Sequence, residues 1–191
     1  MKKLYLIIPL IVVALLTIST AATQEAVSEL SFYFVALNDG GIDDEGVHHQ
    51  LVMSGAGDFN QDEVVGSGSF IHFDNSSGDP AAGEPRTLLG TGTWEAESVV
   101  SWTMTDNPNN PYGEVVSGIV ELEVRLFTED GPEDGIPAIL KVICNVPPAG
   151  IFTGEPEGYF LDTEDGLSFA PTSWPDTNFP VGLTLITRGR N

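Results

Sequence analysis

The segment VVSGIVELEVRLF, residues 115–127, decides the fold class of this chain. Every second residue in its second half is apolar, whereas Glu121, Glu123 and Arg125 stand between the apolar positions. Side chains alternate between the two faces of a β-strand, so this pattern places one face in a core and the other in water. A helix would need apolar residues at spacings of three and four. The segment therefore predicts an amphipathic strand.

The same alternation recurs along the chain and predicts seven or eight strands. Glycine (21 residues) and proline (13 residues) leave little room for long helices. No shift in composition marks a second domain, and the connections have hairpin length. We expect one all-β domain, an antiparallel barrel of about eight strands, with a β-sandwich as the alternative. The expected strands are residues 30–37, 47–59, 64–73, 87–105, 115–127, 138–146, 158–161 and 181–187.

The N-terminus has the pattern of a secretory signal peptide. Two lysines precede an apolar run from Leu4 to Ile18, and small residues follow at Thr20 and Ala22. We expect an apolar helix in residues 1–22 that is cleaved after Ala22, and a mature domain of residues 23–191. The alternative is an uncleaved anchor, which would be the protein's contact with a membrane. Either reading predicts a secreted protein or one at the cell surface.

The chain is strongly acidic, with 28 Asp and Glu against 7 Lys and Arg and a formal net charge of −21. Removal of residues 1–22 takes away two lysines and no acid, which leaves a charge of −23. Such a charge excludes nucleic acids and anionic lipid surfaces as partners and favours solubility. The lone Cys144 cannot form an internal disulfide, and its place in an alternating apolar segment predicts a buried structural thiol.

One short pattern occurs three times on consecutive expected strands. Residues 55–59, 66–70 and 90–94 each read glycine, small, glycine, polar, aromatic. In an extended strand both glycines and the aromatic ring lie on the same face. Paired glycines permit strong coiling, and aromatic rings from neighbouring strands cover the bare backbone. We therefore expect valine to overpack the strand at four of these positions, namely Gly66, Gly68, Gly90 and Gly92.

This glycine-rich texture, from Gly55 to Trp94, resembles the strands of dirigent and allene-oxide-cyclase-like proteins. The resemblance implies a small up-and-down barrel of eight strands with an interior cavity that can hold a small apolar ligand. No residue of this chain matches the catalytic residues of those families, so none is carried over.

Three histidines are the main candidates for metal or acid–base chemistry. His48 and His49 are adjacent and so point to opposite faces of one strand, whereas His49 and His72 can meet across neighbouring strands. With Asp74 or Glu45 nearby, this pair could bind zinc or copper. The alternative is three isolated histidines on the surface or lining the barrel.

Calcium is the second metal candidate. Asp58, Asn60 and Asp62 supply oxygen donors at the first, third and fifth positions of an EF-hand-type loop. Glu63 and Ser69 stand where that loop requires glycine and glutamate, so an EF-hand is excluded. A weak calcium site remains open beside a plain solvated turn. Two more acidic turns contain Asn38, Asp39, Asp43, Asp44 and Glu45, and Asp162, Glu164 and Asp165.

Asn75 begins the sequence Asn-Ser-Ser, an N-glycosylation acceptor in an expected exposed loop. This position agrees with an exported protein.

Three functions follow from these patterns. The first is a secreted acidic barrel without catalytic activity that binds a small apolar ligand or a surface partner. The second is an extracellular structural domain stabilised by calcium. The third is a barrel enzyme of the cyclase or isomerase type, which the sequence supports least because it contains no nucleophile motif such as Gly-x-Ser-x-Gly.

Overall fold

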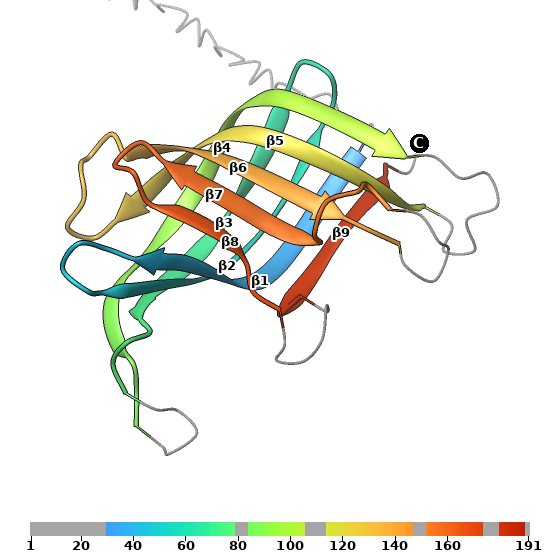
Figure 1. The fold of residues 1–191 in the computed structure, drawn as a ribbon. Coiled ribbons are helices and arrows are strands. Elements are labelled where there is room, and N and C mark those ends of the chain that lie inside the picture. The colour runs from blue at the N-terminus through green and yellow to red at the C-terminus, as the bar shows by residue number, and fades with distance from the viewer. Residues whose placement is uncertain (1–29, 79–83, 106–113, 147–151, 174–179, 190–191) are drawn as a thin grey trace, which may run out of the picture.

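The computed structural model describes residues 30–78, 84–105, 114–146, 152–173 and 180–189, in which all regular structure is β-strand (Figure 1). The expected signal segment, residues 1–22, lies outside these ranges. Within them, no helix has the length and apolarity needed to cross a membrane. The strands are β1 (Leu30–Ile42), β2 (His48–Phe59), β3 (Val64–Asp74), β4 (Thr87–Thr105), β5 (Val115–Thr128), β6 (Ile136–Cys144), β7 (Gly158–Thr163), β8 (Ser168–Pro171) and β9 (Gly182–Arg188).

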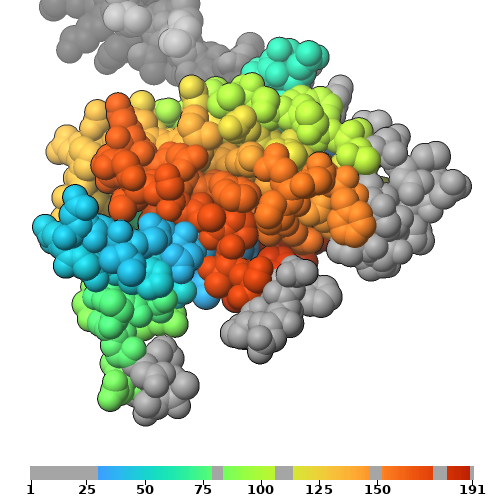
Figure 2. Space-filling view, viewed as in Figure 1, coloured from blue at the N-terminus to red at the C-terminus, as the bar shows by residue number. Residues whose placement is uncertain are grey.

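The strands form one closed antiparallel barrel. Each of β1 to β7 pairs with the next strand along the chain, and β8 closes the ring by pairing with β1 at Asn38 and Asp39. The first half of β1 pairs instead with β9, which also pairs with the start of β5. In the space-filling view, β7 and β8 fill the wall between β6 and the β1–β2 hairpin (Figure 2). The predicted barrel is confirmed as eight strands plus one additional strand, and the sandwich alternative is wrong.

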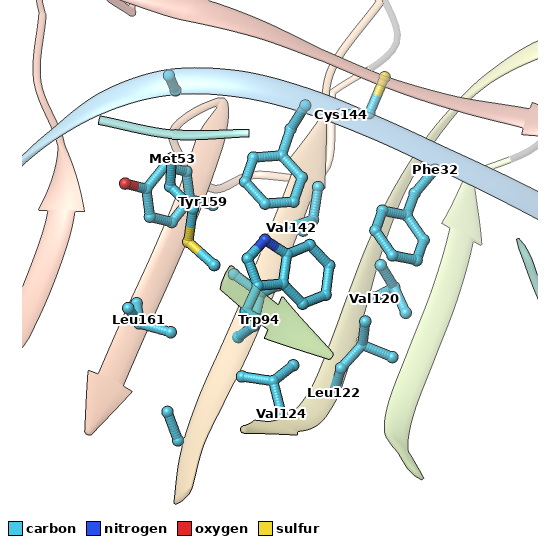
Figure 3. Packing of buried hydrophobic residues seen from close by; sticks show 14 of the residues in the cluster. Phe32, Met53, Trp94, Val120, Leu122, Val124, Val142, Cys144, Tyr159 and Leu161 are labelled. Carbon is cyan, nitrogen blue, oxygen red and sulfur yellow. The ribbon is translucent and has the colours of Figure 1, made fainter. Parts of the chain in front are cut away.

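The centre of the barrel is filled by side chains. Trp94 from β4 is fully buried and lies among residues of other strands, including Phe32 of β1 and Leu122 of β5 (Figure 3). Its ring stacks on Phe34 with centroids 5.8 Å apart, and Phe34 in turn contacts Tyr159 at 5.2 Å. Each of these five side chains is at most 2% exposed. A small molecule therefore has no room in this middle layer.

The strand β5 has the two faces that its sequence predicts. Val120, Leu122, Val124 and Leu126 are buried, whereas Glu123 is exposed on the opposite face.

Two local predictions were wrong. The segment 38–41 is not a turn, because β1 continues through it to Ile42 with a bulge between Asp39 and Gly41. The Asn38 side chain is buried there and donates a hydrogen bond to the backbone oxygen of Tyr159 at 2.5 Å. The four-residue strand β8 was missed, since so short a segment contains no readable alternation.

The glycine pattern has the predicted packing at all but one of the four positions. A Cβ atom built on Gly66 would lie 3.0 Å from the Phe32 ring. A Cβ atom built on Gly68 would lie 2.5 Å from the indole nitrogen of Trp94. At Gly92 it would meet the Phe70 ring at 2.5 Å. At Gly90 nothing lies within 4 Å, so the expectation of a close approach is wrong there.

Cys144 is a buried thiol, as predicted, with only 1% of its surface exposed. Burial raises its pKa to about 11, and the thiol lies 3.6 Å from the backbone oxygen of Thr184. A thiol that stays protonated at neutral pH is a poor nucleophile and metal ligand.

Candidate functional site

The candidate site lies at one end of the barrel, which we call the mouth. The β1–β2, β5–β6 and β7–β8 connections lie at this end, on the left in Figure 1, and β3 ends and β4 begins at the same end of the barrel. All three histidines lie here, because β2 begins and β3 ends at the mouth.

Two of the histidines contact each other, as the sequence predicts. Nδ1 of His49 lies 2.9 Å from Nε2 of His72 on the neighbouring strand. The other nitrogen of His49 lies 3.1 Å from a carboxylate oxygen of Asp43. The acid is thus neither Asp74 nor Glu45, which were the predicted partners. Asp43 lies in the β1–β2 turn, six residues before His49, and the turn folds it back onto the strand.

When both rings are neutral, the hydrogen bonds determine which nitrogen of each histidine carries the proton. The Val47 backbone N–H, which donates to Asp43 at 2.8 Å, holds the pKa of this carboxyl below its usual range, and His49 lowers it further. An ionised carboxylate can only accept, so Nε2 of His49 donates to Asp43. In neutral His49, Nδ1 then accepts from Nε2–H of His72. Nδ1 of neutral His72 is left as an acceptor, and no described residue donates a hydrogen bond to it.

The surroundings of His72 favour its neutral form. Burial lowers the pKa of His72, and the nearby His49 lowers it further, against a smaller opposite effect of Asp165. The His72 and Phe169 rings pack nearly perpendicular to each other, with centroids 5.6 Å apart. The absent side chain of Gly40 makes this packing possible, since a Cβ atom there would lie 2.6 Å from Phe169 and 2.9 Å from His49.

The lowered pKa of His72 predicts a pH-dependent stability. The unfolded chain, with an ordinary histidine pKa near 6.5, binds more protons than the folded one just below that pH, so stability falls as pH falls through this window. We expect the melting temperature to drop more between about pH 7.5 and about pH 5.5 in the wild type than in His72→Gln. The carboxylates are common to both proteins, so equal drops would contradict the prediction.

A pocket opens beside His72 at the mouth. It has a volume of about 290 Å³, and its walls include Phe70, Leu88, Leu89 and Gly90. Gly90 lies on the face of β4 that points into the barrel, and the open space beside it is part of this pocket. Thr128, Glu129 and Asp130 at the end of β5 complete the rim. The arrangement combines the apolar side chains of Phe70, Leu88 and Leu89 with threonine hydroxyls, one nitrogen acceptor and two carboxylates.

His48 points away from the pair, as expected for adjacent strand residues. Its Nε2 lies 2.9 Å from both carboxylate oxygens of Asp39. Asn75, the predicted glycosylation site, pairs with the same residue, since its backbone N–H donates to the His48 oxygen at 2.6 Å. The asparagine is half-buried rather than on a fully exposed loop. Glycosylation of Asn75 stays a prediction.

The predicted calcium ligands lie at the end of the barrel opposite the mouth. Asp58 accepts a hydrogen bond from the Ser31 hydroxyl at 2.6 Å, and the Asn60 side-chain oxygen accepts from the backbone N–H groups of Asp62 and Glu63 at 2.8 and 2.9 Å. Among the described residues, no three His, Cys, Asp or Glu side chains form a group that could hold a metal. That result does not cover asparagine ligands, so calcium at this turn stays a prediction.

A second depression, of about 520 Å³, lies on the outer wall over β4 to β7. Four carboxylates line it, from Glu97, Glu123, Asp162 and Glu164. Its one arginine, Arg125, donates to Glu97 at 2.5 Å and to the backbone oxygen of Asp134 at 3.0 Å. This depression is open and acidic, and its arginine is already paired with Glu97. We therefore place the candidate site at the mouth.

The sequence indicated the His49–His72 pair and placed Asp43 in an acidic turn, but it indicated neither the contact of Asp43 with His49 nor Phe169 nor the pocket. The contact of Asp43 with His49 could have been predicted from the sequence, because a residue in a short turn between paired strands lies close to the first residues of the second strand. The pocket had no signal in the sequence.

No protein-family model matches the chain, and comparisons with curated proteins and with solved structures gave no match. The resemblance to dirigent and allene-oxide-cyclase-like barrels therefore stays a prediction.

Proposed function

We propose that this protein is a secreted, non-catalytic barrel that binds a small molecule at its mouth, with Nδ1 of His72 accepting a hydrogen bond from the ligand. One observation carries the proposal: the chain of hydrogen bonds from Asp43 through His49 ends in an acceptor beside a pocket that has both apolar and polar walls. The filled middle of the barrel supports the mouth, rather than the interior, as the place of the ligand.

The pocket limits the chemistry of the ligand. A volume of about 290 Å³ is at the lower end of the usual range for ligand pockets, so the ligand is small. Phe70, Leu88 and Leu89 favour an aromatic or aliphatic body. Glu129, Asp130 and the net charge of −21 repel anions. The class is a neutral or cationic small molecule with an apolar body and one hydrogen-bond donor.

A matched pair of probes tests this proposal. p-Cresol has the required ring and donor, whereas 4-methylanisole has the same ring but no donor. We expect p-cresol to bind about 5- to 10-fold more tightly, since a neutral hydrogen bond contributes about 1 kcal/mol. Binding is measured by NMR titration of the His72 imidazole resonances.

The Gly90→Leu variant provides the control, because its side chain would fill the pocket without meeting an atom at the Cβ position. We expect it to fold normally and to lose p-cresol binding. Equal binding of the two probes, or unchanged binding in Gly90→Leu, would remove His72 and the pocket from the proposed function.

The same hydrogen-bond chain supports a second candidate, a cyclase- or isomerase-type enzyme. A carboxylate that orients one histidine and so sets the basicity of the next is an arrangement used for general-base catalysis. A molecule recovered from the protein chemically unchanged, as seen by mass spectrometry, supports binding. Conversion that is lost in His72→Gln supports the enzyme.

A further inference from the structure

One side of the outer wall has almost no charge. Three rows of paired residues run across β9, β1, β2, β3 and β4, and their side chains point outward because they alternate with the buried core residues. We call these rows the uncharged face. They are Leu37–Val52–Ile71–Thr91, Leu183–Val35–Ser54–Ser69–Thr93 and Leu185–Tyr33–Ala56–Ser67–Glu95.

The contrast with the rest of the chain is large. Of these fourteen residues only Glu95, at one corner, is charged, whereas 35 of all 191 residues are Asp, Glu, Lys or Arg. Charged outward residues lie on the opposite wall, where β5, β6 and β7 carry Glu121, Glu123, Arg125, Lys141 and Asp162, and at the edge of the face, where the next row contains Asp58. Solubility does not require an uncharged wall, so this face has another use.

The face is apolar enough to bind a protein but not to enter a lipid layer. Tyr33, Val35, Ile71 and Leu183 are 45%, 38%, 39% and 47% exposed. Serine and threonine hydroxyls lie between them, and these groups lose hydrogen bonds in a lipid layer. The two central strands, β2 and β3, are paired on both sides over these rows, so there a partner meets side chains rather than a free strand edge.

We infer that the occupant of the uncharged face is a second copy of this chain. Each copy carries a net charge of −21, so two copies repel each other over most of their surfaces. The uncharged face is where they can touch without placing like charges in contact. A basic protein would instead be drawn to the acidic opposite wall. A two-fold dimer places the same patch on both partners, and Ser54 lies on the middle strand of the middle row.

The size of the face predicts a weak, reversible dimer. Five strands about 4.8 Å apart span about 19 Å, and three rows with their side chains cover about 20 Å along the strands. The footprint of roughly 400 Å² is about half of the area that each partner buries in a stable complex, which is about 800 Å². This inference does not depend on ligand binding at the mouth.

Sedimentation of the chain without residues 1–22 tests the inference. We expect the mass to rise from one toward two chains as concentration increases from about 10 µM to about 500 µM. Raising sodium chloride from about 0.02 M to about 0.5 M should strengthen the dimer, because salt screens the repulsion between the two net charges. An interface held by ion pairs would weaken instead, and a single chain at every concentration would overturn the inference.

Two charge variants locate the contact. Ser69→Glu and Val35→Glu place a carboxylate in the middle row, and both should abolish dimer formation. Val100→Glu is the matched control, since Val100 is 50% exposed on β4 but outside the rows. Circular dichroism checks that each variant folds. Dimers that persist in folded Ser69→Glu and Val35→Glu would place the contact elsewhere and overturn the inference.

Cross-linking through an introduced cysteine tests whether the partner at this face is a second copy of the chain. Cys144 is buried, so Ser54→Cys introduces an accessible thiol at the centre of the face. Mild oxidation of the purified variant should give a disulfide-linked dimer much faster than oxidation of Val100→Cys. Equal rates for the two variants would mean that the face does not meet its own copy.

Discussion

Replacing Trp94 by alanine should destabilise the barrel by about 3–5 kcal/mol, the range for large-to-small changes at fully buried aromatic residues. Trp94 is 0% exposed, stacks on Phe34 and donates its indole N–H to the Ser54 backbone oxygen at 3.0 Å. The alanine variant leaves a cavity in the middle layer and an acceptor without this donor. Chemical unfolding followed by circular dichroism measures the loss. Trp94→Phe, which keeps most of the ring, should lose clearly less.

The change at Trp94 is coupled to Gly55. A Cβ atom at Gly55 would collide with the six-membered ring of the tryptophan, so Gly55→Ala should be strongly destabilising in the wild type. In Trp94→Ala that ring is absent, and the nearest remaining atom is the Ser67 backbone oxygen at 3.0 Å. We expect Gly55→Ala to cost clearly less there than in the wild type, because only the contact with this oxygen remains. Additive effects in the double-mutant cycle would contradict the proposed covering of glycine by tryptophan.

Replacing Gly68 or Gly92 by alanine should destabilise by about 3 kcal/mol, at the upper end of overpacking effects. A Cβ atom at these positions would collide with the backbone oxygen of Ser54 or of Phe127. Backbone oxygens in a paired sheet cannot move aside as a flexible side chain can. The melting temperature should fall by about 6–12 °C, since 1 kcal/mol corresponds to about 2–4 °C in a domain of this size.

Gly90→Ala is the matched control for these variants. Gly90 lies on the same strand and in the same copy of the motif as Gly92, but its Cβ atom would meet nothing within 4 Å. We expect its stability to equal that of the wild type or to exceed it slightly, because alanine has less conformational freedom in the unfolded chain. Equal losses at Gly68, Gly90 and Gly92 would mean that the cost comes from strand flexibility rather than from collisions.

At the candidate site, the sequence predicts the contact between the two histidines but not the acid that pairs with them. Hairpin-length connections between predicted strands indicate that β2 and β3 are neighbours, and hence that His49 and His72 can meet. His49 pairs with Asp43 rather than with Asp74 because β1 extends to Ile42, which places Asp43 in the turn beside His49. The sequence Asn38-Asp39-Gly40-Gly41 favours a turn, but burial of Asn38 and the packing of Phe169 over Gly40 keep this segment in the sheet. Tertiary packing therefore outweighed the local turn preference.

The sequence by itself determined the alternation of each long strand, and with it the two faces of β5 and the burial of Cys144. These features are local, because a strand's two-residue period assigns every side chain to one face or the other. Only the tertiary structure decided how the barrel closes, through β8 and β9 on opposite halves of β1. Closure sets the pairing register, and the register aligns residues distant in the chain. This register places Trp94 and the Ser54 backbone against Gly68 but leaves Gly90 open to the pocket. It also places uncharged residues of five strands side by side.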